Sequence, residues 1–395
     1  MSTTNNAVIL SAARTPIGSF LGCLSAIPAP RLGATAIKAA LERAKLSGDK
    51  VDQVIMGNVL AAGEGQAPAR QASIFAGIPH SAGATTINKV CGSGMQALNL
   101  AKNAILTGES ECVVAGGMEN MSLTPYFMQD ARTGFRMGEK KLIDSMVHDG
   151  LWDPYNNFHM GSAAELCVKE YHFTREEQDR FSKQSFERAQ AAIKSGAFKK
   201  EIATISVPQR KGDALIIDTD EGPGKADFAK MAALKPVFEK DGTITAANAS
   251  TINDGAAALI VSSQDFAKRN GIQPIARIVS CAIHSQAPEW FTTAPVEAMK
   301  KALAKANMKA SDIDLWEVNE AFAVVALAAA KGLEIPETKL NINGGGISLG
   351  HPIGASGARI VVTLLHALEQ RGVKRGMASL CIGGGEGIAM IVERM

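Results

Sequence analysis

The sequence predicts an α/β protein with a mostly parallel sheet, and two observations support this. Short apolar runs alternate with helical ones over the first 120 residues, which is typical of strand–helix–strand units. A second alternating unit runs from about residue 272 to the end and repeats the order of turn, helix, strand and double glycine. We therefore expect two duplicated halves, with their sheets side by side and their central helices back to back.

The predicted elements of the two halves follow in order along the chain. Strands are expected over 8–12, 54–59 and 111–116 and helices over 31–43, 69–76 and 94–107; a strand over 256–261, a helix over 321–331, a helix over 358–370 and a strand over 378–382 follow later. Residues 121–248 differ because they are richer in charge and irregular, apart from a helical segment over 175–197. Such an insertion commonly builds a substrate site over a scaffold. The expected division is an N-terminal half (1–120 with 249–271), an inserted loop domain (121–248) and a C-terminal half (272–395).

Composition limits the class of protein and of partner. The 395 residues are 46% hydrophobic and 20% charged, and 41 Lys and Arg against 39 Asp and Glu leave a net charge of +2. This balance gives no overall field that would recruit nucleic acid or an anionic membrane. The six cysteines have neither metal-ligand spacing nor the pattern of a secreted disulfide framework, which favours free thiols in a reducing compartment. With no signal peptide pattern and no apolar stretch of about 20 residues, we expect a cytoplasmic protein.

Three glycine-bounded turns, over 90–94, 351–354 and 381–385, carry the candidate chemistry. Cys91 directly precedes a helical run, where the helix dipole is expected to lower the thiol pKa and favour thiolate. A lone cysteine is usually a small buried hydrophobe, and a lone glycine-rich turn is usually only a loop. Together, however, Cys91, His351 and Cys381 offer a nucleophile, an electrophile or base, and a second base, which indicates acyl transfer through a thioester.

These motifs resemble the thiolase family, of the biosynthetic type, over essentially the whole chain. The segments that carry the resemblance are 12–18, 88–97, 319–323, 350–352 and 381–385. The resemblance implies two βαβαβαββ halves in five layers (α-β-α-β-α), with a loop domain inserted in the first half. It implies an acyltransferase that reversibly condenses two acetyl-CoA into acetoacetyl-CoA and CoA by a ping-pong mechanism. It also implies a homotetramer, with the irregular stretch 123–146 as the candidate tetramer contact.

The resemblance assigns a role to each catalytic candidate. Cys91 would accept the acetyl group, and His351 would help to deprotonate it and later donate to the thioester oxygen. Cys381 would remove the α-proton from the second acetyl-CoA. Asn319 would fix a water or donate a hydrogen bond, and would thereby complete with His351 a first oxyanion hole, for the enolate. Backbone N–H groups of Cys91 and Gly383 would form a second one, for the tetrahedral intermediate on Cys91.

Substrate contacts are implied in the same way. Coenzyme A is expected to lie across the inserted loop domain as part of the substrate, so no separate cofactor is expected. The implied contacts are Leu151, His159 and Met160 on the pantetheine channel, Ser250 on a pantetheine amide, Lys225, Asp227 and Lys230 on the nucleotide, and Phe291, Ala321 and Phe322 on the acyl or CoA part. From the residues alone, a solvated charged face is the commoner explanation for the two lysines, and His159 would equally belong to the core or the surface.

Phe291 departs from the biosynthetic pattern, because many such enzymes have methionine near the acyl pocket at this position. It resembles instead the potassium-activated, mitochondrial-type thiolases, which accept a 2-methyl branch. A potassium ion would use carbonyls of residues 246, 247, 249 and 347 together with a tyrosine hydroxyl. Phe186 stands where that tyrosine belongs, so the cation would lose an oxygen ligand, and we expect no metal.

Three alternatives remain from the sequence. The first is a degradative 3-ketoacyl-CoA thiolase of broader chain length, although the segment 159–161 favours the short-chain type. The second is a ketoacyl synthase or hydroxymethylglutaryl-CoA synthase, which would lack the partner thiol Cys381. The third is a catalytically silent acyl-CoA-binding homologue, against which the presence of Cys91, Asn319, His351 and Cys381 argues.

Overall fold

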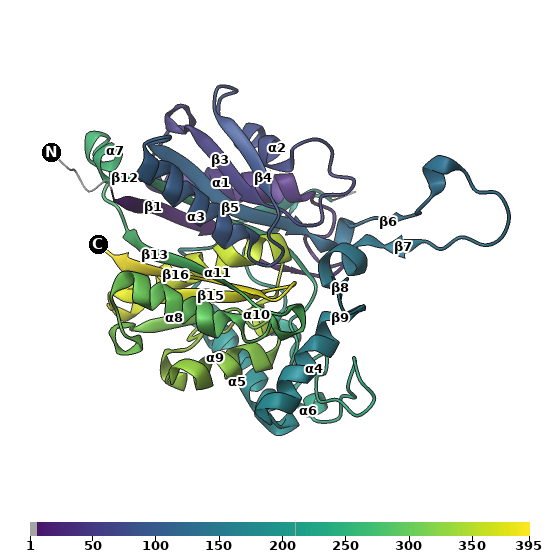
Figure 1. The fold of residues 1–395 in the computed structure, drawn as a ribbon. Helices are drawn as coiled ribbons and strands as arrows, with labels where there is room; N and C mark the ends of the chain where they lie inside the picture. The colour runs from purple at the N-terminus through teal and green to yellow at the C-terminus, as the bar shows by residue number, and fades with distance from the viewer. Residues whose placement is uncertain (1–5, 210) are drawn as a thin grey trace.

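The computed structural model describes residues 6–209 and 211–395, and its centre is one mixed sheet of ten strands (Figure 1). The first half contributes β1 (Ala7–Arg14), β2 (Gly18–Ser19), β3 (Gln53–Gly57), β4 (Gly83–Ile87), β5 (Cys112–Asn120) and β12 (Asn253–Ser263). The second half contributes β13 (Ala276–Ser285), β14 (Leu315–Val318), β15 (Arg375–Ile382) and β16 (Glu386–Arg394). A short pairing of β1 with β13 joins the halves.

The duplication is visible in the strand order. The order β1-β12-β5-β3 in the first half is repeated as β13-β16-β15-β14 in the second. In place of a partner like β4, β14 has a parallel bridge between Trp316 and Leu340. The expectation of a mostly parallel sheet was wrong. Among the named strands of the described residues, only β3–β4, β3–β5 and β14–β15 pair in parallel, because β12 and β16 run back between strands that point the other way.

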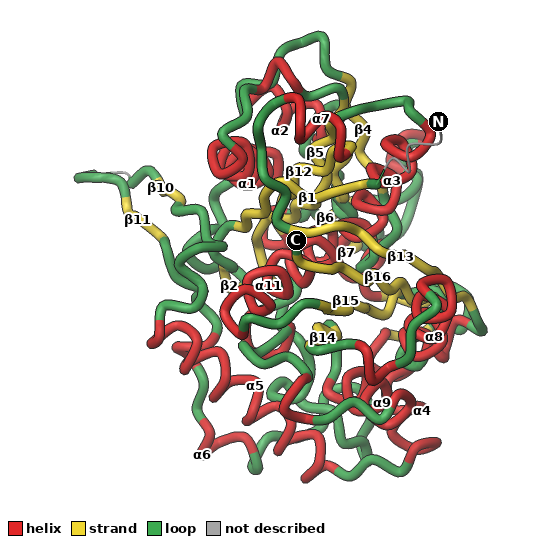
Figure 2. Tube along the Cα trace, turned by 90° about the vertical axis from the view of Figure 1, so that its left-hand side faces the viewer, coloured by secondary structure: helices red, strands yellow, loops and turns green. Residues whose placement is uncertain are grey.

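Helices cover the sheet in three layers, so the fold has five layers in all (Figures 1 and 2). One outer layer holds α1 (Ala29–Ala44) and α2 (Pro68–Phe75), and the other holds α8 (Ala294–Ala306) and α9 (Ala323–Leu333). Between the two halves lie α3 (Ser93–Thr107) and α11 (Ile353–Arg371), which pack on each other and on strands. One of the hydrophobic cores is built around this central pair.

Glycines allow α3 and α11 to approach closely near their N-termini. A Cβ atom on Gly94 would lie 2.6 Å from the backbone nitrogen of Ala358, and one on Gly357 would lie 2.4 Å from that of Met95. Only glycine fits such a backbone-to-backbone contact. Because Cys91 precedes α3 and His351 precedes α11, this contact brings the two residues to the same place.

Residues 121–248 contain the most irregular part of the chain. Its elements are the hairpin β6 (Tyr126–Phe127) and β7 (Ile143–Asp144), the pair β8 (Trp152–Asp153) and β9 (Phe158–His159), helices α4 (Met160–Tyr171), α5 (Arg175–Ser195) and α6 (Phe228–Met231), and the hairpin β10 (Ile205–Val207) and β11 (Leu215–Ile217). The segment is joined to β1 by the buried Arg14, whose guanidinium pairs with Glu201 at 2.5 Å and Asp220 at 2.7 Å. Two further short helices, α7 (Gln264–Arg269) and α10 (Gly346–Leu349), lie outside this segment.

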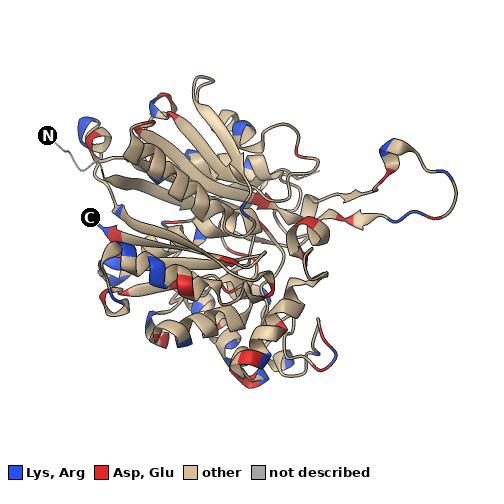
Figure 3. Cartoon of the chain, viewed as in Figure 1, with Lys and Arg blue, Asp and Glu red and all other residues tan. Residues whose placement is uncertain are grey.

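The surface carries charges of both signs. On the face drawn in Figure 3, acidic and basic residues alternate over the helices and loops without a broad field of one sign. All six cysteines are free thiols. Within the described ranges, the helices are too short or too polar to span a membrane.

Candidate active site

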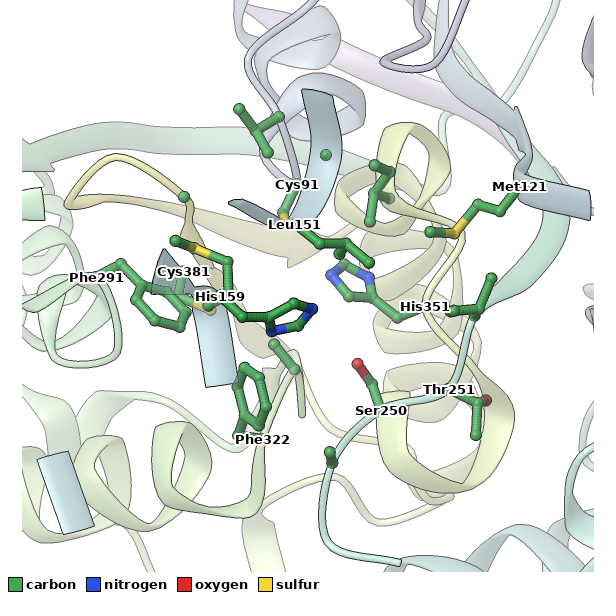
Figure 4. A pocket seen from close by; sticks show the side chains of 18 of the residues that line it. Cys91, Met121, Leu151, His159, Ser250, Thr251, Phe291, Phe322, His351 and Cys381 are labelled. Carbon is green, nitrogen blue, oxygen red and sulfur yellow. The ribbon is translucent and has the colours of Figure 1, made fainter. Parts of the chain in front are cut away.

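The three glycine-bounded turns meet at one cavity of about 210 Å³. Cys91 lies just before α3, His351 just before α11, and Cys381 at the end of β15, so three separate elements deliver the three groups. Figure 4 shows Cys91, Cys381, His159 and His351 around one space, with Phe291 and Phe322 beside it. The walls are mainly apolar, so a bound acyl group would be removed from water.

Most of the residues expected from the sequence line this cavity. They are Cys91, Leu151, His159, Met160, Ser250, Phe291, Ala321, Phe322, His351, Cys381 and Gly383. Lys225 instead lines a second cavity of about 580 Å³, which shares Ser250 and its neighbours with the first. Asp227 and Lys230 line neither cavity; they pair with each other at 2.7 Å on the surface, where their side chains are 47% and 78% exposed.

The turn that carries Cys91 is held in a strained conformation. Val90 has φ of 45°, a left-handed value that a β-branched residue rarely adopts. Its N–H donates to Asn88 Oδ1 at 2.9 Å, its carbonyl accepts from Ser93 Oγ at 2.7 Å, and Gly92 N–H closes the turn onto the Lys89 carbonyl at 3.0 Å. Strain of this kind persists where surrounding bonds hold it, often at functional sites.

The expected depression of the Cys91 pKa is not found. Desolvation in the apolar cavity raises the pKa of this thiol to about 11, although the backbone N–H groups of Gly383 and of Cys91 itself act in the opposite direction. The helix that follows Cys91 is visible in the sequence, but the burial of the thiol, which has the larger effect on its pKa, is not. The resting side chain is therefore a thiol, and it must lose its proton to a base before it attacks.

His351 is fixed at both its backbone and its ring. Its N–H donates to Asn253 Oδ1 at 2.9 Å, directly after Gly350, whose φ of 111° favours glycine. Ring Nδ1 lies 2.6 Å from Ser356 Oγ, and that hydroxyl donates its only proton to the Pro352 carbonyl at 2.9 Å. With the hydroxyl proton directed to Pro352, we interpret Nδ1 as the protonated ring nitrogen, which leaves the lone pair on Nε2.

Electrostatics also keep the imidazole neutral. Burial, assisted by the positive charge of Arg359, lowers the pKa of His351 to about 3. A neutral imidazole with a free Nε2 lone pair can accept a proton from a nearby thiol. The geometry and the charge environment thus agree on the same protonation state.

Asn319 is buried behind His351 and does not line the cavity. Arg359 Nη2 donates to Asn319 Oδ1 at 3.5 Å, and the amide nitrogen lies beside the ring, 3.4 Å from His351 Nδ1 and 3.5 Å from Nε2. The structure therefore brings Asn319 to the histidine ring, as the motif order predicts, and leaves its role toward a water as a prediction.

Cys381 and a group of aromatic residues complete the site. Burial raises the pKa of the Cys381 thiol well above its usual value, and a thiolate at Cys91 acts in the same direction. Phe291 and Phe322 meet edge-to-face with ring centroids 6.2 Å apart, and Phe238 stacks on His159 at 4.8 Å. These rings narrow the apolar end of the cavity.

Sequence reasoning missed Phe238, Ser356 and Asn253. Ser356 lies in the glycine-rich turn before the helical run, where its spacing of five from His351 was the available signal. Phe238 and Asn253 lie in or directly after the irregular inserted segment, whose path is set by tertiary contacts. Of the four residues whose carbonyls a potassium ion would use, Ala246, Ala249 and Ile347 line the second cavity beside Phe186, and Ala247 does not. In the part of the chain that the structure describes, no cluster of three or more His, Cys, Asp or Glu is arranged to hold a metal.

Comparison with known proteins identifies the family. A model of the thiolase N-terminal domain matches residues 7–265, and one of the thiolase C-terminal domain matches residues 272–394. The chain belongs to the thiolase family. Among curated thiolase relatives, an acetyl-CoA acetyltransferase of Cupriavidus necator is 54% identical over 98% of this chain and 99% of its own length. Acetyl-CoA acetyltransferase 2 of Arabidopsis thaliana is 51% identical over 98% of this chain and 96% of its own.

Solved thiolase structures share the whole fold. The acetyl-CoA acetyltransferase of Bacillus anthracis has a TM-score of 0.97 at 40% identity and covers 100% of both chains. A thiolase of Ascaris suum, solved in complex with coenzyme A, has a TM-score of 0.94 at 42% identity over 99% of this chain and 100% of its own. The duplicated five-layer thiolase fold expected from the sequence is thereby confirmed.

Proposed function

We propose that this chain is an acetyl-CoA C-acetyltransferase, which condenses two acetyl-CoA into acetoacetyl-CoA and CoA through an acetyl-cysteine. The observation that carries the proposal is the meeting of two thiols and one neutral imidazole at a single apolar cavity. The printed names of the curated relatives, which cover nearly the whole chain, support the same activity. The substrates are CoA thioesters, and no additional cofactor is proposed.

In the first half-reaction, His351 Nε2 takes the proton of Cys91, and the thiolate attacks the carbonyl carbon of acetyl-CoA. Backbone N–H groups of Cys91 and Gly383 point at Cys91 Sγ and are well placed for the oxygen of the tetrahedral intermediate. The carbon–sulfur bond to CoA then breaks, and the departing thiolate takes a proton from Cys381. The products are acetyl-Cys91, free CoA and a Cys381 thiolate.

In the second half-reaction, the Cys381 thiolate removes an α-proton from a second acetyl-CoA. The resulting enolate oxygen accepts from His351 Nε2, which still holds the proton of Cys91, with Asn319 assisting through a water. The enolate carbon attacks acetyl-Cys91, and acetoacetyl-CoA leaves. Cys91 regains its proton from His351, and Cys381 has already regained its own, so all protons balance.

The acyl chain is proposed to be short. Phe291, Phe322 and Met160 crowd the apolar cavity, whose volume is about 210 Å³. The pantetheine arm would pass Leu151, His159 and Ser250, and the nucleotide would extend along the second cavity toward Lys225. To contact the nucleotide, Asp227 and Lys230 would have to break the ion pair that they form with each other. Otherwise they would remain part of a solvated surface.

The main alternative is a degradative 3-ketoacyl-CoA thiolase, which would use the same residues on longer chains. The deciding measurement is kcat/KM for CoA-dependent thiolysis of acetoacetyl-CoA, its 2-methyl derivative and a long-chain 3-ketoacyl-CoA. We expect acetoacetyl-CoA to be cleaved fastest, because the aromatic residues shorten the acyl end. Faster long-chain cleavage would move the enzyme to the degradative class, and no cleavage of any substrate would indicate a silent homologue.

Assembly, location and domain division complete the proposal. A homotetramer is supported by the hairpin around β6 and β7, which projects from the body of the molecule (Figure 1) and exposes Phe135, Met137 and Leu142. Met137 is 93% exposed in the isolated chain, and a second copy would cover it. Light scattering of the intact protein and of a Met137→Glu variant would test this. We keep a cytoplasmic location and the division at 1–120 with 249–271, 121–248 and 272–395 as proposals.

A further inference from the structure

The two turns that bear the reacting groups touch each other. We call residues 88–92 the Cys91 turn and residues 381–385 the Gly383 turn. A Cβ atom on Gly92 would lie 2.4 Å from Ile382 Cδ1, and one on Gly383 would lie 3.6 Å from Val90 Cγ1. The distance between the turns sets where the Gly383 N–H lies relative to Cys91 Sγ, whose pKa this N–H lowers.

One ion pair spans these turns. Lys89 Nζ lies 2.6 Å from Glu386 Oε2, and the two side chains are only 22% and 28% exposed. This shielding separates the pair from ordinary surface ion pairs, which water and salt weaken. Lys89 is two residues before Cys91, and Glu386 is three residues after Gly383.

Both ends of the pair are anchored in rigid structure. On one side, the Lys89 N–H donates to Ser93 Oγ at 2.8 Å, and the Lys89 carbonyl accepts the bond that closes the Cys91 turn. On the other side, Glu386 Oε1 accepts from Ser285 Oγ at 2.9 Å, and the residue pairs with Ile382 across the β15–β16 hairpin. The attraction between the two side chains therefore pulls the two turns together, because neither residue lies in a flexible loop.

We propose that the Lys89–Glu386 ion pair is a clamp that holds the Cys91 turn against the Gly383 turn, which makes Lys89 and Glu386 positioning residues for acyl transfer. The inference rests on the proposed function for its catalytic meaning, since it assumes that Cys91 is the nucleophile. Its structural part is independent of that function: it states only that the ion pair keeps the Gly383 N–H where it stabilises the Cys91 thiolate.

A simpler electrostatic role makes a different prediction. If the two side chains acted only through their fields, removing the Lys89 charge would disfavour the thiolate, and removing the Glu386 charge would favour it. A clamp predicts that both changes disfavour the Cys91 thiolate, because either change releases the two turns from each other. Lys89→Met removes the positive charge from a flexible, unbranched side chain, and Glu386→Gln removes the negative charge at equal length, so the two variants separate these cases.

The test follows alkylation of Cys91 by iodoacetamide in the full-length protein, with the Cys91 peptide quantified by mass spectrometry. Below the thiol pKa, the logarithm of the rate rises linearly with pH, and a change in pKa displaces this line. We expect both variants to displace the line to higher pH by about half a unit, and to slow alkylation at fixed pH about threefold. The double variant should match either single one, since the second change has no intact pair to break.

Controls keep the outcomes distinct. Lys200→Met breaks the exposed pair with Glu369, far from the cavity, and should leave the line unmoved. Displacements of opposite sign, an additive double variant or no displacement in either variant would overturn the clamp. Acetylation of Cys91 by acetyl-CoA, measured in parallel, should slow by a similar factor without a change in KM. If wild-type Cys91 is never acetylated, the proposed function fails while the alkylation result still decides the clamp.

Discussion

Ser356 Oγ lies 2.6 Å from His351 Nδ1 and donates a hydrogen bond to the Pro352 carbonyl at 2.9 Å. This pairing sets the tautomer of the imidazole and points the free lone pair of Nε2 toward the cavity. Because Nδ1 keeps its proton, any proton that the ring accepts from Cys91 must reside on Nε2, where an enolate oxygen would need a donor.

Ser356→Ala should therefore lower kcat about 10- to 100-fold while KM changes little, because the ring loses its orienting partner. Steady-state kinetics of thiolysis measure both values. Ser356→Thr retains the hydroxyl and should restore most of the rate. An alanine variant with full kcat would refute the tautomer assignment.

Cys91→Ser should abolish covalent acetylation, because a serine hydroxyl is far harder to ionise than a thiol in this apolar cavity. We expect kcat to fall by more than about a thousandfold. Incubation with acetyl-CoA followed by intact-protein mass spectrometry shows whether an acetyl group is bound. Cys23→Ser, which changes a thiol outside both cavities, is the matched control; normal turnover by the Cys91 variant would contradict the mechanism.

Cys381→Ser should separate the two half-reactions. A CoA thiolate can leave without assistance more easily than a carbon acid can ionise, so acetylation of Cys91 should remain largely intact. Condensation should slow by at least about a hundredfold, because the base for the α-proton is lost. Rapid-quench measurement of acetyl-enzyme beside steady-state condensation makes the comparison, and equal losses in both steps would rule out the assigned role.

Reactivity of Cys91 in the free enzyme should increase steeply with pH. Its thiol pKa is raised to about 11, so the reactive thiolate is scarce at neutral pH and grows about tenfold with each pH unit below that value. Iodoacetamide alkylation between pH 7 and 10 provides the measurement. A rate that levels off near pH 7 would mean that the thiol is already ionised in the resting enzyme.

Phe291→Ala should widen the acyl end of the cavity. We expect the ratio of kcat/KM for a longer 3-ketoacyl-CoA to that for acetoacetyl-CoA to rise about tenfold or more. Phe266→Ala removes a buried ring of α7 outside the cavity and serves as a control for lost stability, with no change in the ratio. An unchanged ratio in the Phe291 variant would remove this residue from the specificity determinants.

Much of the site and of the fold could be predicted from local sequence patterns. Cys91, His351 and Cys381 each sit in a short turn whose glycines and following helix are visible in the chain itself. Strand direction was misjudged for two reasons. β12 returns to the sheet only after the long segment 121–248, and β16 turns back beside β15 through the short glycine turn 383–385, which was interpreted as a site turn and not as a hairpin. The Cys91 pKa was misjudged for a related reason: burial depends on Met160, Phe291 and other residues that arrive from distant segments.

The contact between Gly94 and Gly357 has a consequence for how activity arises during folding. The first half of the chain brings Cys91, whereas His351, Cys381 and Gly383 all come from the second. The first half alone would hold the nucleophile Cys91 without its base, and the second half alone would hold the base His351 without the nucleophile. Catalytic competence is thus an all-or-none property of the paired halves, and its first appearance in a refolding experiment should report the moment at which the two central helices seat against each other.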